Sequence, residues 1–150
     1  MSFDPGLAKA IARIGRLQKT IEELATLPRA VARISAPKLS KLMAKQFSSG
    51  CDPYGKPWRP ITATTKRLRK GRKGGRPLTD TGRLRAGTGV SVTRSGAKLV
   101  IGAPYGAFHQ TGTKNMPARR IFPQFGLPAA WRAVLQDTAR AELRRRLRSA

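Results

Sequence analysis

The chain has 150 residues, with 31 Lys and Arg against 7 Asp and Glu, which gives a formal net charge of +24 at pH 7. This length favours one domain over residues 1–150, and the charge destabilises a lone compact chain while attracting nucleic acid or acidic protein surfaces. Leu, Ile, Val and Phe make up only about a fifth of the residues, close to the level of highly charged disordered chains. We therefore expect partners, either other copies or a polyanion, to supply part of the stability.

The residue types that catalysis and metal binding require are scarce. His109 and Cys51 are the only residues of their types, and Asp52 and Asp80 are the only carboxylates between positions 24 and 136. A zinc site needs about four ligands, and a two-metal site needs several carboxylates. The sequence therefore predicts no enzyme and no such metal site, and we expect His109 to be a packed, hydrogen-bonded residue.

The sequence also bears on location. No apolar run approaches the roughly 18 residues that span a bilayer, and the first residues lack a signal-peptide pattern. A single cysteine excludes an intrachain disulfide. We expect a protein made in the cytoplasm, with no membrane partner.

Residues 5–24 have the pattern of an amphipathic helix. Asp4 and Pro5 are typical of a helix start. Apolar residues then recur at spacings of three and four: Leu7, Ile11, Ile14, Leu17, Ile21 and Leu24. This stripe must dock on something, either its own domain or a coiled-coil seam with a sister subunit.

Pro28 interrupts this pattern, and a second helical segment follows to Phe47. Within it, Pro37 predicts either a kink or a new start with Ser35 as the cap. We interpret residues 1–49 as a helical hairpin.

Residues 50–77 form a basic loop rich in glycine and proline, with a short helix predicted to begin at Thr62. Eight basic residues and no acid occur in its second part: Arg59, Lys66, Arg67, Arg69, Lys70, Arg72, Lys73 and Arg76. Two interpretations stay open, a solvated loop or an arm that contacts phosphates or an acidic partner. Tyr54 and Trp58 beside it could stack on nucleic-acid bases.

Residues 78–126 are predicted to form a β-hairpin and an aromatic loop core. Val90 and Val92 alternate with polar residues, and residues 97–101 alternate in the same way beyond a turn at 94–96. Aromatic and histidine side chains then alternate with glycines, which indicates close backbone approach.

Residues 127–150 are predicted to form a basic C-terminal helix that Pro128 opens. Its apolar residues recur in steps of four: Trp131, Leu135, Ala139, Leu143 and Leu147. Most of its arginines lie off that line. The elements together predict an α+β fold: an N-terminal helical hairpin, a central antiparallel β-hairpin with a loop-rich segment, and a C-terminal helix.

Four short motifs in this order resemble the virion-morphogenesis, or tail-completion, family of tailed bacteriophages. They are Gly55-Lys56-Pro57-Trp58, Leu78-Thr79-Asp80-Thr81-Gly82-Arg83-Leu84, residues 101–112, and Pro117-Ala118-Arg119-Arg120-Ile121-Phe122. The resemblance extends over residues 5–148. The chain departs from the family pattern at Gly106, where alanine is more usual, and in the strongly basic segment 69–76.

The resemblance implies a structural subunit of the virion neck or upper tail, without a cofactor, that forms a homo-oligomeric ring of six or twelve copies. Expected partners are adjacent neck or tail proteins and packaged double-stranded DNA in the lumen. Residues expected in the core or between subunits are Trp58, Tyr105, Phe108, His109, Pro117, Arg119 and Phe122. Alternatives are a sequence-independent DNA-binding protein, and a tail terminator or capsid-assembly factor.

Overall fold

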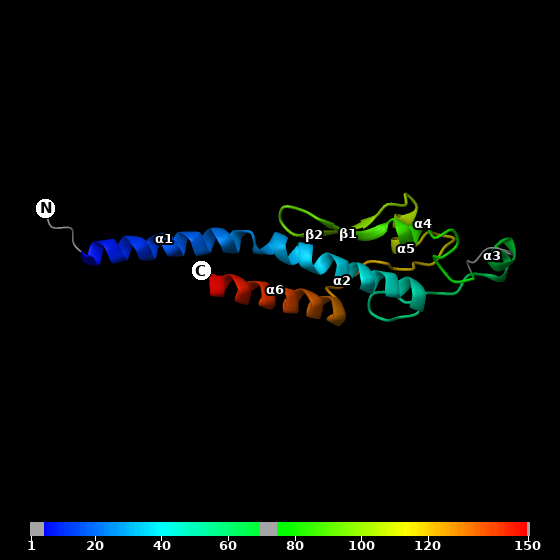
Figure 1. Ribbon diagram of the computed structural model, residues 1–150. Helices are drawn as coiled ribbons and strands as arrows, with labels where there is room; N and C mark the ends of the chain where they lie inside the picture. Colours follow the sequence, from blue (N-terminus) through cyan, green and yellow to red (C-terminus); the bar gives the residue numbers. More distant parts are fainter. Residues whose placement is uncertain (1–4, 70–74, 150) are drawn as a thin grey trace.

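The computed structural model describes residues 5–69 and 75–149. Its longest feature is a bent helical rod made of α1 (Pro5–Ala25) and α2 (Leu27–Ser49), which follow each other end to end (Figure 1). The prediction of two helices within residues 1–49 is thus confirmed. They form one long bent unit, in which α1 does not fold back along α2. Instead α1 projects away from the rest of the molecule (Figure 1).

The bend lies at Thr26, one residue before α2 begins. Pro28 has no N–H to donate to Leu24, and a proline ring crowds the carbonyl four residues earlier, so the regular helix is interrupted here. Thr26 donates from both its backbone N–H (3.3 Å) and its hydroxyl (2.9 Å) to the carbonyl of Glu23. At Pro37, by contrast, α2 continues without a new start.

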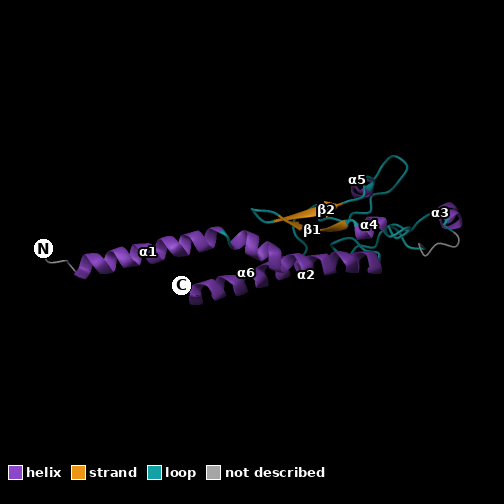
Figure 2. Ribbon diagram, turned by 45° about the horizontal axis from the view of Figure 1, so that its top comes forward, coloured by secondary structure: helices purple, strands orange, loops and turns teal. Residues whose placement is uncertain are grey.

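The predicted hairpin is confirmed as β1 (Thr88–Val92) and β2 (Ala97–Ile101), an antiparallel pair in which Thr88 lies opposite Ile101 and Val92 opposite Ala97 (Figure 2). Gly96 closes the turn, where its carbonyl accepts from the backbone N–H of Thr93 at 2.8 Å. Two-stranded sheets are marginal alone. This one packs on α2, and α4 (Arg83–Ala86) leads into it.

The last helix, α6 (Ala129–Ser149), runs antiparallel to α2 on the side away from the hairpin, so α2 is the middle layer of an α+β fold (Figure 1). Leu39 and Met43 of α2 pack with Trp131 of α6 in one buried cluster. A second cluster joins Phe47 to the loops: Phe47, Trp58, Leu78, Leu84 and Ile121. Phe122 packs against both clusters and links them.

The buried face of α6 differs from the prediction toward its C-terminus. Trp131 is buried as expected, but Thr138, Glu142 and Arg146 are the buried residues farther along, and Leu147 is 58% exposed. The reason is the bend in the neighbouring rod. Arg146 donates to Thr26 Oγ1 at 2.9 Å and to the carbonyl of Glu23, groups that a straight apolar stripe could not satisfy.

Two further short helices lie with α4 in the loop-rich end of the molecule, opposite the N-terminus (Figure 2). The first, α3 (Ala63–Leu68), begins where the sequence predicted, with the backbone N–H of Thr65 donating to Thr62 Oγ1 at 3.2 Å. The second, α5 (Gly106–Thr111), carries the aromatic and histidine residues.

Candidate functional site

The candidate site is the loop-rich end of the molecule, where hydrogen bonds join α5 to the loop segment 117–122. Gln110 of α5 makes three hydrogen bonds to this segment: its Oε1 accepts from the backbone N–H groups of Ile121 (2.8 Å) and Phe122 (3.0 Å), and its Nε2 donates to the carbonyl of Phe122 (2.9 Å). One amide side chain therefore positions both Ile121 in the core and Phe122 between the two clusters.

Arg119 fixes the same segment to the basic loop. Its guanidinium donates from Nε to the carbonyl of Arg59 (2.8 Å) and from Nη2 to the carbonyl of Pro60 (3.1 Å), while its backbone N–H donates to the carbonyl of His109 (2.7 Å). The residue is only 8% exposed. Burial, and then the nearby charge of Arg69, lower its pKa from the ordinary value of 12.5. Arg119 is therefore part of the interior.

Trp58 is also an interior residue. It is 6% exposed, stacks edge-on against Phe47 with ring centroids 5.6 Å apart, and donates from Nε1 to the carbonyl of Arg120 at 2.9 Å. It is not available for stacking on a base. Tyr54 is exposed, but its hydroxyl accepts from the backbone N–H of Phe125 (2.8 Å) and donates to the carbonyl of Gly126 (2.8 Å).

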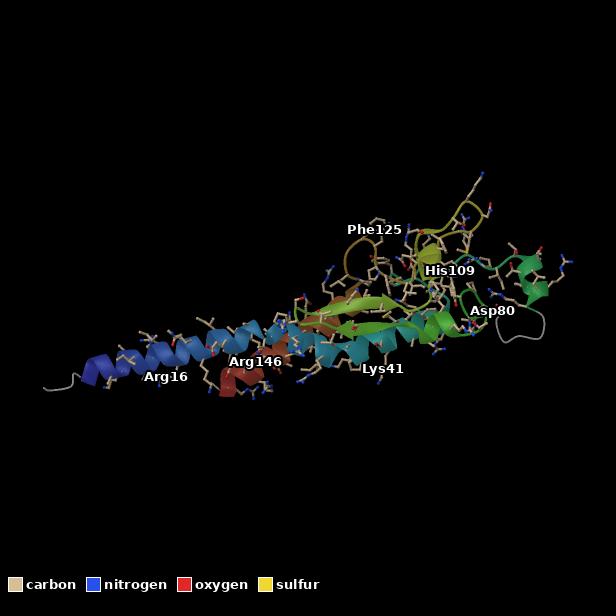
Figure 3. The ribbon with its side chains drawn as sticks, turned by 90° about the horizontal axis from the view of Figure 1, so that it is seen from above. Arg16, Lys41, Asp80, His109, Phe125 and Arg146 are labelled. Atoms are coloured by element: carbon tan, nitrogen blue, oxygen red, sulfur yellow. The ribbon has the colours of Figure 1, made fainter. Side chains whose placement is uncertain are left out.

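A pocket of about 460 Å³ opens beside Arg119, between α3, α5 and the turn before α4. Its lining includes the cations Arg69, Arg83 and Arg119, together with His109 and one carboxylate, Asp80. Asp80 lies 3.6 Å from Nε of Arg69. His109 and Asp80 are both at this end of the molecule in Figure 3. Because positive charges outnumber the one carboxylate in the lining, the pocket favours binding of an acidic group over binding of a basic one.

His109 is half-buried against Tyr105, with ring centroids 5.9 Å apart and ring planes at 87°. Burial lowers its pKa below the ordinary 6.5, and the charges of Arg119 and Arg69 lower it further. Its Nδ1 is buried and has no hydrogen-bond partner within residues 5–69 and 75–149. These surroundings favour the neutral imidazole over the protonated one.

The other predicted core or interface residues divide into two groups. Pro117 and Phe122 are half-buried. Tyr105 is 40% and Phe108 56% exposed. The sequence did not single out Phe125, which is 76% exposed and lies with its ring 5.8 Å from the guanidinium carbon of Arg120. Besides Tyr54, this end of the molecule thus exposes the aromatic side chains of Tyr105 and Phe108, at the start of α5 and within it, and of Phe125 in the loop before α6.

The predicted basic residues lie in different surroundings. Arg59, Lys66 and Arg67 are exposed. Arg69 is half-buried and lies 3.6 Å from Asp80. Arg76 donates to the carbonyl of Ser48 at 2.5 Å and so joins the basic loop to the end of α2. The other predicted contacts, Lys70, Arg72 and Lys73, lie outside the described residues.

Sequence reasoning missed two groups that organise the fold. Gln110 gave no separate signal inside its motif. Glu142 is 6% exposed in its side chain and accepts from Arg145 (2.7 and 2.8 Å) and Arg146 (2.9 Å). These hydrogen bonds, that of Arg145 first, lower the pKa of Glu142 to about 2. The two arginines follow Glu142 by three and four residues, and this spacing is the sequence signal from which these ion pairs could have been predicted.

Within the described residues, no group of three or more His, Cys, Asp or Glu could hold a metal ion. None of the helices in the described part of the chain has the length and apolar character that crossing a membrane requires.

Comparison with known proteins gives one finding. The sequence model of the phage virion morphogenesis family matches residues 8–145, which is most of the chain. No curated protein and no solved structure matches this chain.

Proposed function

Because the chain belongs to the phage virion morphogenesis family, we propose that it is a structural subunit of the virion neck or upper tail. In this role it forms a homo-oligomeric ring of six or twelve copies through which a filled head and a finished tail join. It acts without catalysis or a cofactor, and its place of action is the assembling virion.

The observation that carries this proposal is the exposure of the aromatic side chains Tyr105, Phe108 and Phe125 at the loop-rich end. Aromatic residues are enriched in protein interfaces, and the hydrogen bonds of Gln110 and Tyr54 hold α5 and the loop that bears Phe125 in fixed positions. A ring made by one repeated contact buries such a surface against a different surface of the next copy. The positively charged pocket beside His109 is a suitable seat for an acidic side chain of an adjacent protein.

The test uses a phage in which this gene carries an early stop codon. We expect lysates with full heads and complete tails that remain separate in electron micrographs, and joined particles after the purified chain is added. As a matched pair, Phe108→Ser should fail to restore joining, whereas Ala107→Ser on the same exposed helix should restore it. Joined particles in the uncomplemented lysate would contradict the proposal.

The second candidate function, sequence-independent DNA binding, rests on the net charge of +24 and on the exposed Arg59, Lys66 and Arg67. Each phosphate neutralised by a cation contributes about −0.9 to the slope of log K against log salt concentration for B-DNA. Packaged DNA in the lumen of the ring would be the ligand of the same residues under the first proposal.

Salt titration of DNA binding tests this candidate. Replacing Arg59, Lys66 and Arg67 with glutamine should reduce the slope by about 2.7 if all three contact phosphates. Glutamine at Lys38, Lys41 and Lys45, three exposed lysines of α2, is the control with the same loss of charge. Equal slopes for the two triple variants would show that the loop has no special contact with DNA.

A tail terminator or capsid-assembly factor belongs to the same structural class and differs only in its position in the particle. Gold-labelled antibody against the chain distinguishes them. Label at the joint between head and tail supports the neck, while label on immature capsids supports an assembly factor.

A further inference from the structure

The apolar stripe of α1 is uncovered. Ile11, Ile14 and Leu17 are 56 to 57% exposed, Ile21 is 66% exposed and Leu24 is 38% exposed. Among the described residues, the contacts of α1 with α6 lie near the C-terminal end of α1, where Arg146 of α6 donates to the carbonyl of Glu23. The sequence left two docking surfaces open, and the described part of the chain's own domain does not cover this stripe.

Four of these five exposed residues fit a heptad pattern, with Ile14 and Ile21 at position a and Leu17 and Leu24 at position d. Ala10 occupies the preceding d position, and Ile11 falls at the neighbouring e position, which flanks the seam. Isoleucine at a with leucine at d is the combination that favours parallel two-stranded coiled coils. An a/d stripe is also narrower than the apolar face of a helix that packs on a globular core or lies on a bilayer.

The charges of α1 are arranged as such a pair requires. Lys9, Arg16 and Lys19, as well as both glutamates, fall at positions b, c and f, away from the seam. Among the flanking e and g positions, Arg13 is the only charged residue, and in a parallel pair it faces the uncharged Gln18 of the partner. A chain with a net charge of +24 thus has one helix whose apolar edge can meet its own copy with little repulsion.

We propose that α1 binds the α1 helix of a second copy of this chain as a parallel two-stranded coiled coil. The inference deepens the proposed self-association, because it assigns one of its contacts to α1, and it does not depend on the position of the protein in the virion. The projection of α1 beyond the C-terminal end of α6 leaves room for a second helix alongside it (Figure 1).

The test measures the mass of the full chain by sedimentation at high salt, after nucleic acid has been removed. One double variant, the seam variant, carries Ile14→Gln and Ile21→Gln. The control double variant carries Ala8→Gln and Ala12→Gln. Both double variants add two good helix formers without changing charge, but only the first changes the seam. The seam variant should raise the dissociation constant of the pair at least a hundredfold, and the control should leave it unchanged.

Cross-linking tests the orientation. In a Cys51→Ser background, Ile21→Cys should form a disulfide between two copies, because equivalent a positions face each other in a parallel pair. Glu22→Cys, which faces away from the seam, should not. In an antiparallel pair the two copies of residue 21 would lie roughly 18 Å apart along the axis, so a failure to cross-link would overturn the parallel arrangement.

The outcomes separate this inference from the neck proposal. A seam variant that associates as strongly as the original chain would overturn pairing through α1. The proposal of a ring formed through Tyr105, Phe108 and Phe125 would still stand. An original chain that stays monomeric at all concentrations would overturn self-association as a whole. A monomer that binds anionic lipid vesicles through α1 would also overturn the inference, in favour of a membrane-surface helix.

Discussion

Replacing Gln110 with alanine should destabilise the loop-rich end by an amount that follows from its contacts. The side chain makes three hydrogen bonds, of 2.8 to 3.0 Å, to the backbone of Ile121 and Phe122. A typical hydrogen bond contributes about 0.5 to 1.5 kcal/mol net, so we expect a loss of about 3 kcal/mol in the free energy of unfolding. For a chain of this size, that corresponds to a decrease of roughly 6 to 12 °C in Tm.

The assay is thermal and urea unfolding followed by circular dichroism, at one fixed protein concentration because self-association changes apparent stability. Gln136→Ala on the exposed face of α6 is the control and should change stability by less than about 0.5 kcal/mol. Gln110→Glu keeps an acceptor for the two N–H groups but loses the donor to the carbonyl of Phe122, so it should also destabilise. A loss below about 1 kcal/mol for Gln110→Ala would refute the role of this side chain as the link between α5 and the core.

Three further predictions concern packing and pH. A β-carbon at Gly106 would lie 2.0 Å from Cγ2 of Ile101. Gly106→Ala should therefore lower the free energy of unfolding, measured in urea, by about 1 to 3 kcal/mol. In a double-mutant cycle, Ile101→Ala should restore part of that loss. The lowered pKa of His109 means that stability is fully present above pH 6.5 and is lost as pH falls through the lower folded value; His109→Gln should weaken this decrease, and an unchanged pH profile would contradict it. Glu142, with a pKa of about 2, contributes stability above its ordinary 4.5 that is lost as pH falls toward 2, so acid titrations of Glu142→Gln should lack this component.

Local chemistry predicted the elements well where one residue or one period decides the structure. Alternation gave the hairpin, because successive side chains of a strand point to opposite faces. Thr62 gave the start of α3, because its side chain can satisfy a free N–H of the first turn. The break near Pro28 followed from the missing N–H of proline.

The packing of those elements was less accessible, because it depends on contacts between residues far apart in the chain. Nothing local to α6 indicates that Arg146 lies against Thr26 and replaces leucine on the buried face. Likewise the amide of Gln110 gains its role only when segment 117–122 lies beside α5. The direction of α1 relative to α2 likewise depends on a contact distant in sequence, because α6 rather than α1 packs along α2.

The sequence by itself determined the charge, the α+β order of elements and the resemblance to a family whose model matches residues 8–145. These properties are carried by composition, period and motif order, which need no knowledge of the third dimension. Only the tertiary structure decided that Trp58 and Arg119 are interior while Phe108 and the stripe of α1 are exposed. An apolar side chain is equally suited to a core and to an interface, and the arrangement of the surrounding elements decides which of the two it joins.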